Sequence, residues 1–386
     1  MILMRKTENQ AACEQRGYAM LGIIAAIGIA ATAVVVTSLS ATAVRNEQGR
    51  KDSNALALAK QALIASAASS NSRPGSLPCP DVDNDGTADY VGNDSTRPCM
   101  QRIGRLPWQT LGLPDLRDAA GERLWYAVSL NFQDISANRI NANTTGQFNL
   151  RDGERNTAGI VAIVAAPGKP VGTQTRDATH INNYENYLES YAASELIVNV
   201  LTQDTTHNDQ LSIITPADIF SLVQRRVAKE VQVALQNYYS GSTPSRMPYP
   251  ADAESYDSGT SAYTYPMTVI SPPFSTAVTT GYIPSDDVNL TLPTWFSANL
   301  WNRVLQYNVD SNCLASAVQT SVGTCGTATF SVQSGGVLIG SNGATVSAGT
   351  VAVLTFAGVN AGYTNAASTM LSTAIQVQTQ TQTQPY

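Results

Sequence analysis

The residues most able to do chemistry in this chain lie in one short acidic loop. Its carboxylates occupy positions 1, 3, 5 and 9 of the loop: Asp81, Asp83, Asp85 and Asp89. Gly86 stands at the sixth position, where the chain must turn sharply, and Thr87 offers a backbone carbonyl at the seventh. Calcium prefers roughly six to eight hard oxygen ligands, which alternate carboxylates and a carbonyl in a tight loop can supply. We therefore expect these four aspartates and Thr87 to bind a structural Ca²⁺ ion.

The acidic loop resembles the calcium loops of EF-hand and dockerin proteins, with one departure. Those loops have a bidentate acid at the twelfth position, where this chain has Gly92, and Asp94 could replace it only in a longer loop. The alternative is a solvated turn without metal, because Asp, Asn and Gly are ordinary turn formers. Four carboxylates packed together without a cation would repel one another, which favours the metal.

The cysteine spacing predicts two local disulfides. Of the five cysteines, Cys13 lies near the start of the chain and the other four form two pairs that are close in sequence: Cys79 with Cys99 and Cys313 with Cys325. Such pairing is typical of proteins exported to an oxidising compartment. The first pair would clamp the acidic loop and thereby reduce the conformational entropy of the unfolded chain.

The sequence contains no recognised catalytic signature. The only histidines, His180 and His207, both lie in a polar stretch over 169–210, and no nucleophile motif, H-E-x-x-H motif or phosphate loop is present. The absence of C-x-x-C spacing also disfavours a zinc site. The net charge of -6 has no accompanying basic stripe, so we expect no contact with nucleic acid. We predict a protein that is not an enzyme, with a carboxylate-based glycoside hydrolase as a minor alternative.

The acidic loop is preceded in the sequence by a long uncharged segment. The run from Gly17 to Val44 carries no charge and would rise roughly 40 Å as a helix, more than the thickness of a bilayer's hydrocarbon core. We therefore expect a transmembrane helix. Two alternatives are a secretory signal cut after Ala43 and a signal anchor that is kept uncut.

The residues Arg16-Gly17-Tyr18 at the start of that run resemble the type IV pilin and pseudopilin family. Members of this family carry a short polar leader that ends in Gly and is cut by a prepilin peptidase. The resemblance implies that Gly17 is the last leader residue and that Tyr18 becomes the N-methylated N-terminus. The family usually has Glu at the fifth mature position, where this chain has Gly22. Members without that Glu resemble tip or initiating subunits.

The resemblance also implies a function and a location. We expect a minor pilin or pseudopilin of a type IV pilus or type II secretion-like filament, at or near its tip. Its partners would be other pilin or pseudopilin subunits, bound through the N-terminal helix, together with the prepilin peptidase and the inner membrane. The protein would cross the inner membrane once, with its ectodomain in the periplasm or on a cell-surface filament. The alternatives are a non-polymerising, membrane-anchored periplasmic calcium-binding or adhesive protein and a secreted hydrolase.

Several sequence patterns recur in the same order, which indicates an internal repeat. A helix followed by a P-x-P segment occurs after Ala59 and again after Ala228, and later strand-like segments match in order. We therefore predict an α+β fold in which a long N-terminal transmembrane helix precedes two related lobes, each a helix packed on a small antiparallel sheet. The expected boundaries are a leader over 1–17, a stalk over 18–72, lobes over 73–214 and 215–375 with a polar insertion at 169–210, and a low-complexity tail over 376–386.

Overall fold

The computed structural model describes the chain from residue 43 to residue 378, with gaps. The gaps are residues 192–196, 201–203, 205, 243–245, 252–254, 258–261, 265–279, 286, 310–312, 315–330, 333–343, 346–349 and 357–374. The chain divides into two compact units, Met1–Ala55 and Leu56–Tyr386. The described residues have mixed α+β content, with three α-helices and two four-stranded antiparallel sheets.

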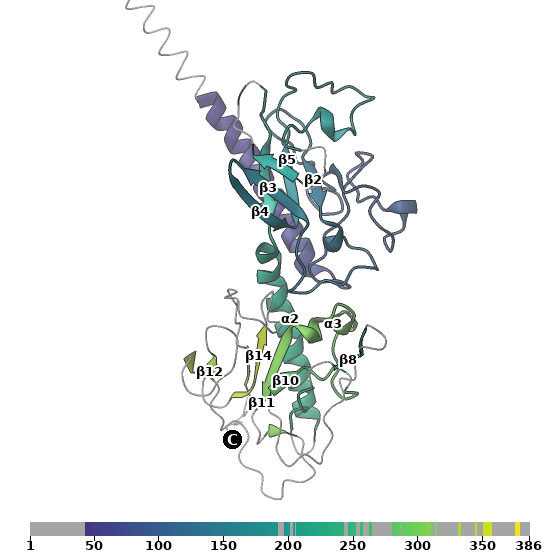
Figure 1. Ribbon diagram of the computed structural model, residues 1–386, viewed down its shortest axis with the longest axis vertical. Coiled ribbons are helices and arrows are strands. Elements are labelled where there is room, and N and C mark those ends of the chain that lie inside the picture. Colours follow the sequence, from purple (N-terminus) through teal and green to yellow (C-terminus); the bar gives the residue numbers. More distant parts are fainter. Residues whose placement is uncertain are drawn as a thin grey trace, which may run out of the picture. The chain divides into compact units, whose positions relative to one another are not determined.

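The first described helix covers residues 43–69 and packs through one face. Besides Ala55, its buried positions are spaced three or four residues apart, as expected for an amphipathic helix: Leu56, Ala59, Leu63 and Ala67. The Nζ atom of Lys60 donates a hydrogen bond of 2.9 Å to the carbonyl of Ile213, which ties this helix to the first sheet. Figure 1 shows the part of this helix that follows Ala55, in purple, beside the strands of that sheet.

The predictions of a transmembrane helix over 18–72 and of a single-pass inner-membrane location are corrected by the structure. Among the described residues, no helix combines the length and the apolar character needed to cross a bilayer. The physical reason is that the helix over 43–69 begins with the charged residues Arg45, Glu47, Arg50 and Lys51. The leader over 1–17 and the apolar segment over 18–42 lie outside the described residues.

The first sheet has the strand order β1-β2-β5-β7 and is antiparallel throughout. Its strands are β1 (Ile103–Arg105), β2 (Trp125–Val128), β5 (Ala162–Ala166) and β7 (Gln210–Ile214). Every residue of β2 and β5 is buried, so these two strands form the centre of the lobe. Short 3-10 turns connect neighbouring segments: η1 (Val91–Asn93), η2 (Leu130–Phe132) and η3 (Tyr184–Asn186).

A second layer covers the first sheet and includes part of the polar insertion. Its strands β3 (Phe148–Asp152), β4 (Arg155–Ile160) and β6 (Ile197–Val200) have the order β4-β3-β6, and β6 runs parallel to β3. Residues of both layers share one hydrophobic core, to which the insertion over 169–210 contributes Tyr187, Leu188 and Val198. The insertion is therefore part of the packed lobe and not only a surface loop.

The helix α2 (Pro216–Gly241) begins at a complete capping box. The hydroxyl of Thr215 accepts a hydrogen bond from the Asp218 amide, and the Asp218 carboxylate accepts one of 2.8 Å from the Thr215 amide. Pro216 occupies the first turn, where its missing N–H has no intrahelical partner to lose. The residue types at 215–218 therefore account for where this helix begins.

The second four-stranded sheet has the order β10-β11-β14-β15. Its strands are β10 (Thr280–Tyr282), β11 (Leu305–Val309), β14 (Thr350–Phe356) and β15 (Ile375–Gln378). Two small hairpins, β8 (Ser255–Asp257) with β9 (Ala262–Thr264) and β12 (Ser331–Val332) with β13 (Ala344–Thr345), lie outside this sheet. The short helix α3 (Thr294–Ala298) and the turn η4 (Trp301–Arg303) precede β11. Figure 1 shows β10, β11 and β14 beside α2.

Each of the two four-stranded sheets binds a proline-containing segment through the same kind of contact, a hydrogen bond from a buried tyrosine. The buried hydroxyl of Tyr126 donates a hydrogen bond of 3.1 Å to the carbonyl of Pro78, and that of Tyr307 donates one of 3.1 Å to the carbonyl of Pro248. Each tyrosine pairs with a glycine of the neighbouring edge strand. Matched contacts of this kind are what an internal repeat predicts.

Candidate metal centre

The acidic loop starts at a residue that is paired with the edge of the first sheet. The amide of Asp81 donates a hydrogen bond of 3.0 Å to the carbonyl of Arg105, and the Arg105 amide donates one of 2.6 Å to the carbonyl of Asp81. This close approach requires Gly104, because a Cβ atom there would lie 2.4 Å from the Asp81 carbonyl oxygen. The side chain of Asp81 is completely buried as a result.

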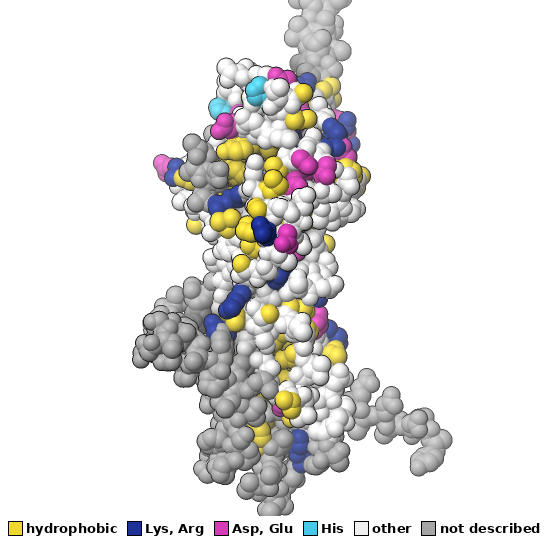
Figure 2. Space-filling model, turned by 90° about the vertical axis from the view of Figure 1, so that its right-hand side faces the viewer, with side chains coloured by type: hydrophobic (Ala, Val, Ile, Leu, Met, Phe, Trp, Pro, Cys, Tyr) yellow, Lys and Arg dark blue, Asp and Glu magenta, His cyan; other side chains and the backbone are white. Residues whose placement is uncertain are grey.

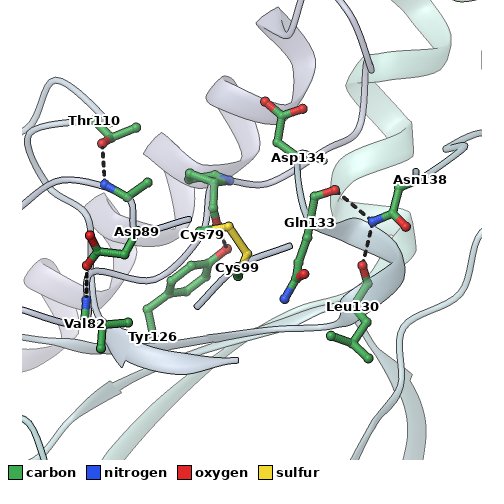
Figure 3. Close-up of a disulfide and its surroundings, with 12 residues drawn as sticks. Cys79, Val82, Asp89, Cys99, Thr110, Tyr126, Leu130, Gln133, Asp134 and Asn138 are labelled. Carbon is green, nitrogen blue, oxygen red and sulfur yellow. Dashed lines mark hydrogen bonds between the residues drawn. A yellow bond between two sulfur atoms is a disulfide. The ribbon is translucent and has the colours of Figure 1, made fainter. Parts of the chain in front are cut away.

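Three of the predicted ligands converge at this point. Carboxylate oxygens of Asp81, Asp83 and Asp89 all lie within 4.8 Å of one another. Asp81 is buried, Asp89 is half-buried and Asp83 is exposed, so the cluster opens to solvent on one side. The Asp89 carboxylate also accepts a hydrogen bond of 2.6 Å from the amide of Val82, which is drawn in Figure 3. This acidic cluster could hold a metal ion.

The fourth predicted carboxylate, that of Asp85, is not part of the cluster. The carboxylate of Asp85 accepts hydrogen bonds of 2.7 Å from both the amide and the hydroxyl of Thr87. Gly92 lies in η1, and the carboxylate of Asp94 accepts hydrogen bonds from the amide and hydroxyl of Thr96. The loop therefore satisfies some of its own polar groups with side chains that were predicted as ligands.

Burial controls the electrostatics of the cluster. Desolvation raises the pKa of the Asp81 carboxyl to about 6, and the nearby carboxylates of Asp85 and Asp89 add to this effect. The amides of Asn84 and Gly86 donate hydrogen bonds of 2.6 and 2.7 Å to the two Asp81 oxygens, which lowers the pKa in part. A bound cation would favour the ionised form of Asp81 and offset the repulsion between the carboxylates.

Two residues outside the loop, Gln109 and Arg123, donate hydrogen bonds to it. Gln109 donates hydrogen bonds to the carbonyls of Gly86 and Asp85, of 2.8 and 2.7 Å. The guanidinium of Arg123 donates bonds to the carbonyl and side-chain oxygens of Asn84, which is 39 residues away in the sequence. The sequence does not identify Gln109 and Arg123 as partners of the loop, because no local motif marks a residue that lies so far from the loop in the chain.

A glycine is required at the sixth position of the loop, as predicted. Gly86 has a φ of +94°, a conformation that side-chain-bearing residues rarely adopt. A Cβ atom at this position would also lie 2.5 Å from the indole nitrogen of Trp108. The loop thus approaches the Trp108 ring more closely than any residue with a side chain would allow.

The predicted disulfide between Cys79 and Cys99 is confirmed. The two Cα atoms are 5.3 Å apart, and the bond closes the segment that contains the acidic cluster. Figure 3 shows the disulfide next to the ring of Tyr126. In the second predicted pair, Cys313 is buried and Cys325 lies outside the described residues, as do Cys13, Gly17 and Tyr18.

Both histidines belong to short turns of the same type. Asp177 and Asp204 each accept hydrogen bonds from the Thr two residues later and from the amide of the following histidine, His180 or His207. Figure 2 shows histidine side chains in cyan, with acidic side chains in magenta, on the surface it presents. Among the described residues, the acidic cluster at Asp81 is the only group of three or more His, Cys, Asp or Glu side chains close enough to share a metal ion.

Comparison of the chain with known protein families, with curated proteins and with solved structures gives no match. The resemblance to pilins and pseudopilins therefore depends on the chain's own residues. The residues that carry it most specifically, Arg16, Gly17 and Tyr18, lie outside the described part of the chain.

Proposed function

We propose that this protein is a minor pilin or pseudopilin, a structural subunit at or near the tip of a type IV pilus or type II secretion-like filament. The observation that carries the proposal is the sequence Arg16-Gly17-Tyr18 followed by an uncharged run. In the family that this pattern resembles, a prepilin peptidase cuts after the Gly and the apolar segment then packs against other subunits. Gly22, in place of the usual Glu, supports a terminal position in the filament.

The surface of the helix over 43–69 supports this assignment. The residues Ala57, Leu58 and Ala65 are exposed on the side opposite the buried stripe, and Leu58 retains 49% of its accessible surface. Small and apolar side chains on an exposed helix face allow a neighbouring helix to approach closely. We infer that this face contacts the helices of other subunits.

We further propose that the metal of the acidic cluster is Ca²⁺ and that it stabilises the loop. The side chains of Asp81, Asp83 and Asp89 offer only oxygen donors, which hard cations prefer, whereas zinc and copper sites use nitrogen or sulfur. Three carboxylates leave the remaining coordination positions of Ca²⁺ to carbonyls and water. The Cys79–Cys99 disulfide keeps the two ends of the segment together while the ion binds.

The N-terminus of the mature protein tests the filament proposal. Full-length protein produced together with a prepilin peptidase is expected to start at Tyr18 and to carry a methyl group, as measured by intact mass and N-terminal sequencing. Gly17→Val should leave the leader attached, because the peptidase requires Gly at the cut. The matched control Gly22→Ala changes a glycine beyond the cut and should be processed normally. An N-terminus at Met1 or at Val44 in the wild-type protein would contradict the proposal.

Thermal unfolding with and without calcium tests the metal proposal. A ligand present at about 100 times its dissociation constant stabilises a protein by about 2.7 kcal/mol. We expect the melting temperature to rise by several degrees with Ca²⁺ and to fall again with a chelator. Asp81→Asn should abolish the rise, whereas Asp94→Asn, which alters a carboxylate outside the cluster, should not.

The calcium effect should also depend on pH in a defined direction. Because burial raises the pKa of Asp81 to about 6, protons compete with the cation for this carboxylate below that pH. The rise in melting temperature should therefore be complete at neutral pH and be lost as the pH falls through about 6. A melting temperature that Ca²⁺ leaves unchanged at neutral pH would remove the metal from the proposal.

A further inference from the structure

Two carboxyl groups meet where the polar insertion returns to the first sheet. Glu189 follows the core residue Leu188, and Asp209 directly precedes β7. The amide of Asn208 donates a hydrogen bond of 3.0 Å to Glu189 Oε2, and the amide of Ser190 donates one of 2.9 Å to Asp209 Oδ2. These reciprocal bonds join the end of the insertion to its middle.

The hydrogen bonds leave one oxygen of this pair without a donor. Glu189 Oε1 accepts a bond from the side-chain amide of Gln174. Asp209 Oδ1 is buried and has no hydrogen-bond partner. A buried acceptor without a donor is costly, and two ionised carboxylates in contact repel each other. One proton held between the two carboxyls removes both costs, because it supplies the missing donor and cancels one charge.

The pKa of Asp209 agrees with a shared proton. Burial, together with the charge and side-chain contact of Glu189, raises the pKa of Asp209 to about 8, although the amide of Ser190 opposes this rise. The guanidinium of Arg176 donates a bond of 2.7 Å to Gln174 Oε1, so it reaches Glu189 only through the amide of Gln174. Other charged or titratable groups on the elements around the pair include Arg105, Asp118, Glu122, Lys169, Tyr187, Tyr191, Asp204 and His207.

We propose that Glu189 and Asp209 form a proton-dependent latch, which holds the end of the insertion over 169–210 against the first sheet and opens when the shared proton is lost. An unfolded aspartate loses its proton near pH 4, about its ordinary pKa. The latched pair keeps its proton until the pH approaches the raised pKa of about 8. The latch is therefore strongest in acid, weakens as the pH rises across this window, and is open above it. It does not depend on the filament proposal.

Amide hydrogen exchange on the full-length protein tests the latch. The amides of Ser190 and Asn208 donate to the two carboxyls, so they report directly on its opening. After correction for the intrinsic exchange rate, we expect their protection to fall at least about tenfold between roughly pH 6 and pH 9. Asp209→Asn should remove this pH dependence, because the amide group can donate to Glu189 without a titrating proton. Glu189→Gln should do the same.

The control variant is Asp204→Asn, which changes an exposed carboxyl five residues before Asp209. Its hydrogen bonds to Thr206 hold the pKa of Asp204 at about 2, so it carries no proton in the tested range. This variant should keep the pH dependence of the wild-type protein. Infrared spectra at neutral pH provide a second readout, in which the wild-type protein should show a protonated carboxyl band that is missing in Asp209→Asn. The latch is refuted by protection that does not change with pH, by an unchanged dependence in Asp209→Asn, or by the absence of that band.

Discussion

Tyr126→Phe removes one buried hydroxyl and, with it, the hydrogen bond that ties the P-x-P segment to the first sheet. Tyr126 is 1% exposed, and its hydroxyl lies 3.1 Å from the carbonyl oxygen of Pro78. The net value of such a bond is about 0.5 to 1.5 kcal/mol, and a buried acceptor left without a donor costs about 1 to 3 kcal/mol. We expect the free energy of unfolding to fall by about 1 to 3 kcal/mol.

Tyr307→Phe is the matched change in the second sheet. Tyr307 is completely buried, and its hydroxyl makes the same 3.1 Å bond to the carbonyl of Pro248. Since the two tyrosines share no hydrogen-bond partner, the losses in the double variant should add to within about 0.5 kcal/mol. Equal effects are expected because the surroundings of the two hydroxyls match.

Urea unfolding of the full-length protein, followed by circular dichroism and tryptophan fluorescence, measures these losses. Two probes are needed because the two four-stranded sheets can unfold in separate transitions, in which case each variant should shift only the transition of its own sheet. Unfolding of either variant at the same urea concentration as the wild-type protein would contradict the expected loss. A change in stability of opposite sign in Tyr126→Phe and Tyr307→Phe would contradict it as well.

Two further predictions concern the acidic loop. Replacing Cys79 and Cys99 together by Ser should lower the free energy of unfolding by about 3 kcal/mol, because the disulfide closes a segment with a sequence separation of 20; reducing the wild-type protein should have the same effect, and equal stability with and without reductant would contradict it. Gly86→Ala should cost about 2 to 4 kcal/mol through its positive φ and its contact with Trp108. Its control, Gly153→Ala, has a φ of +58° but nothing within 4 Å of the added Cβ, so it should cost less in the same unfolding assay.

Features that depend on neighbouring residues could be predicted from the sequence. The predicted disulfide between Cys79 and Cys99 follows from a short spacing and is confirmed, and the capping box likewise joins Thr215 to a residue only three positions away. The requirement for glycine at position 86 follows from the sharp turn of an acidic loop. In each case the interacting groups are joined by a short chain, so few conformations compete with the observed one.

Only the tertiary structure shows which residues form the candidate metal site. The sequence marked four aspartates as ligands, and the fold gathers Asp81, Asp83 and Asp89, while Asp85 accepts hydrogen bonds from Thr87. The regular spacing of the aspartates does not indicate which carboxylates will accept a hydrogen bond from a nearby donor. Only the packed structure determines this, because the donors compete with the metal for the same oxygens.

The sequence determined the local chemistry of this protein, and the tertiary structure decided which distant residues share a core or a site. The insertion over 169–210 is polar in composition, yet its residues Tyr187 and Val198 pack in the core with Trp125. The apolar run likewise predicted a membrane-spanning helix, whereas no helix among the described residues meets that requirement. The physical reason is that burial depends on the combined surfaces of segments far apart in the chain, which no local pattern of residues contains.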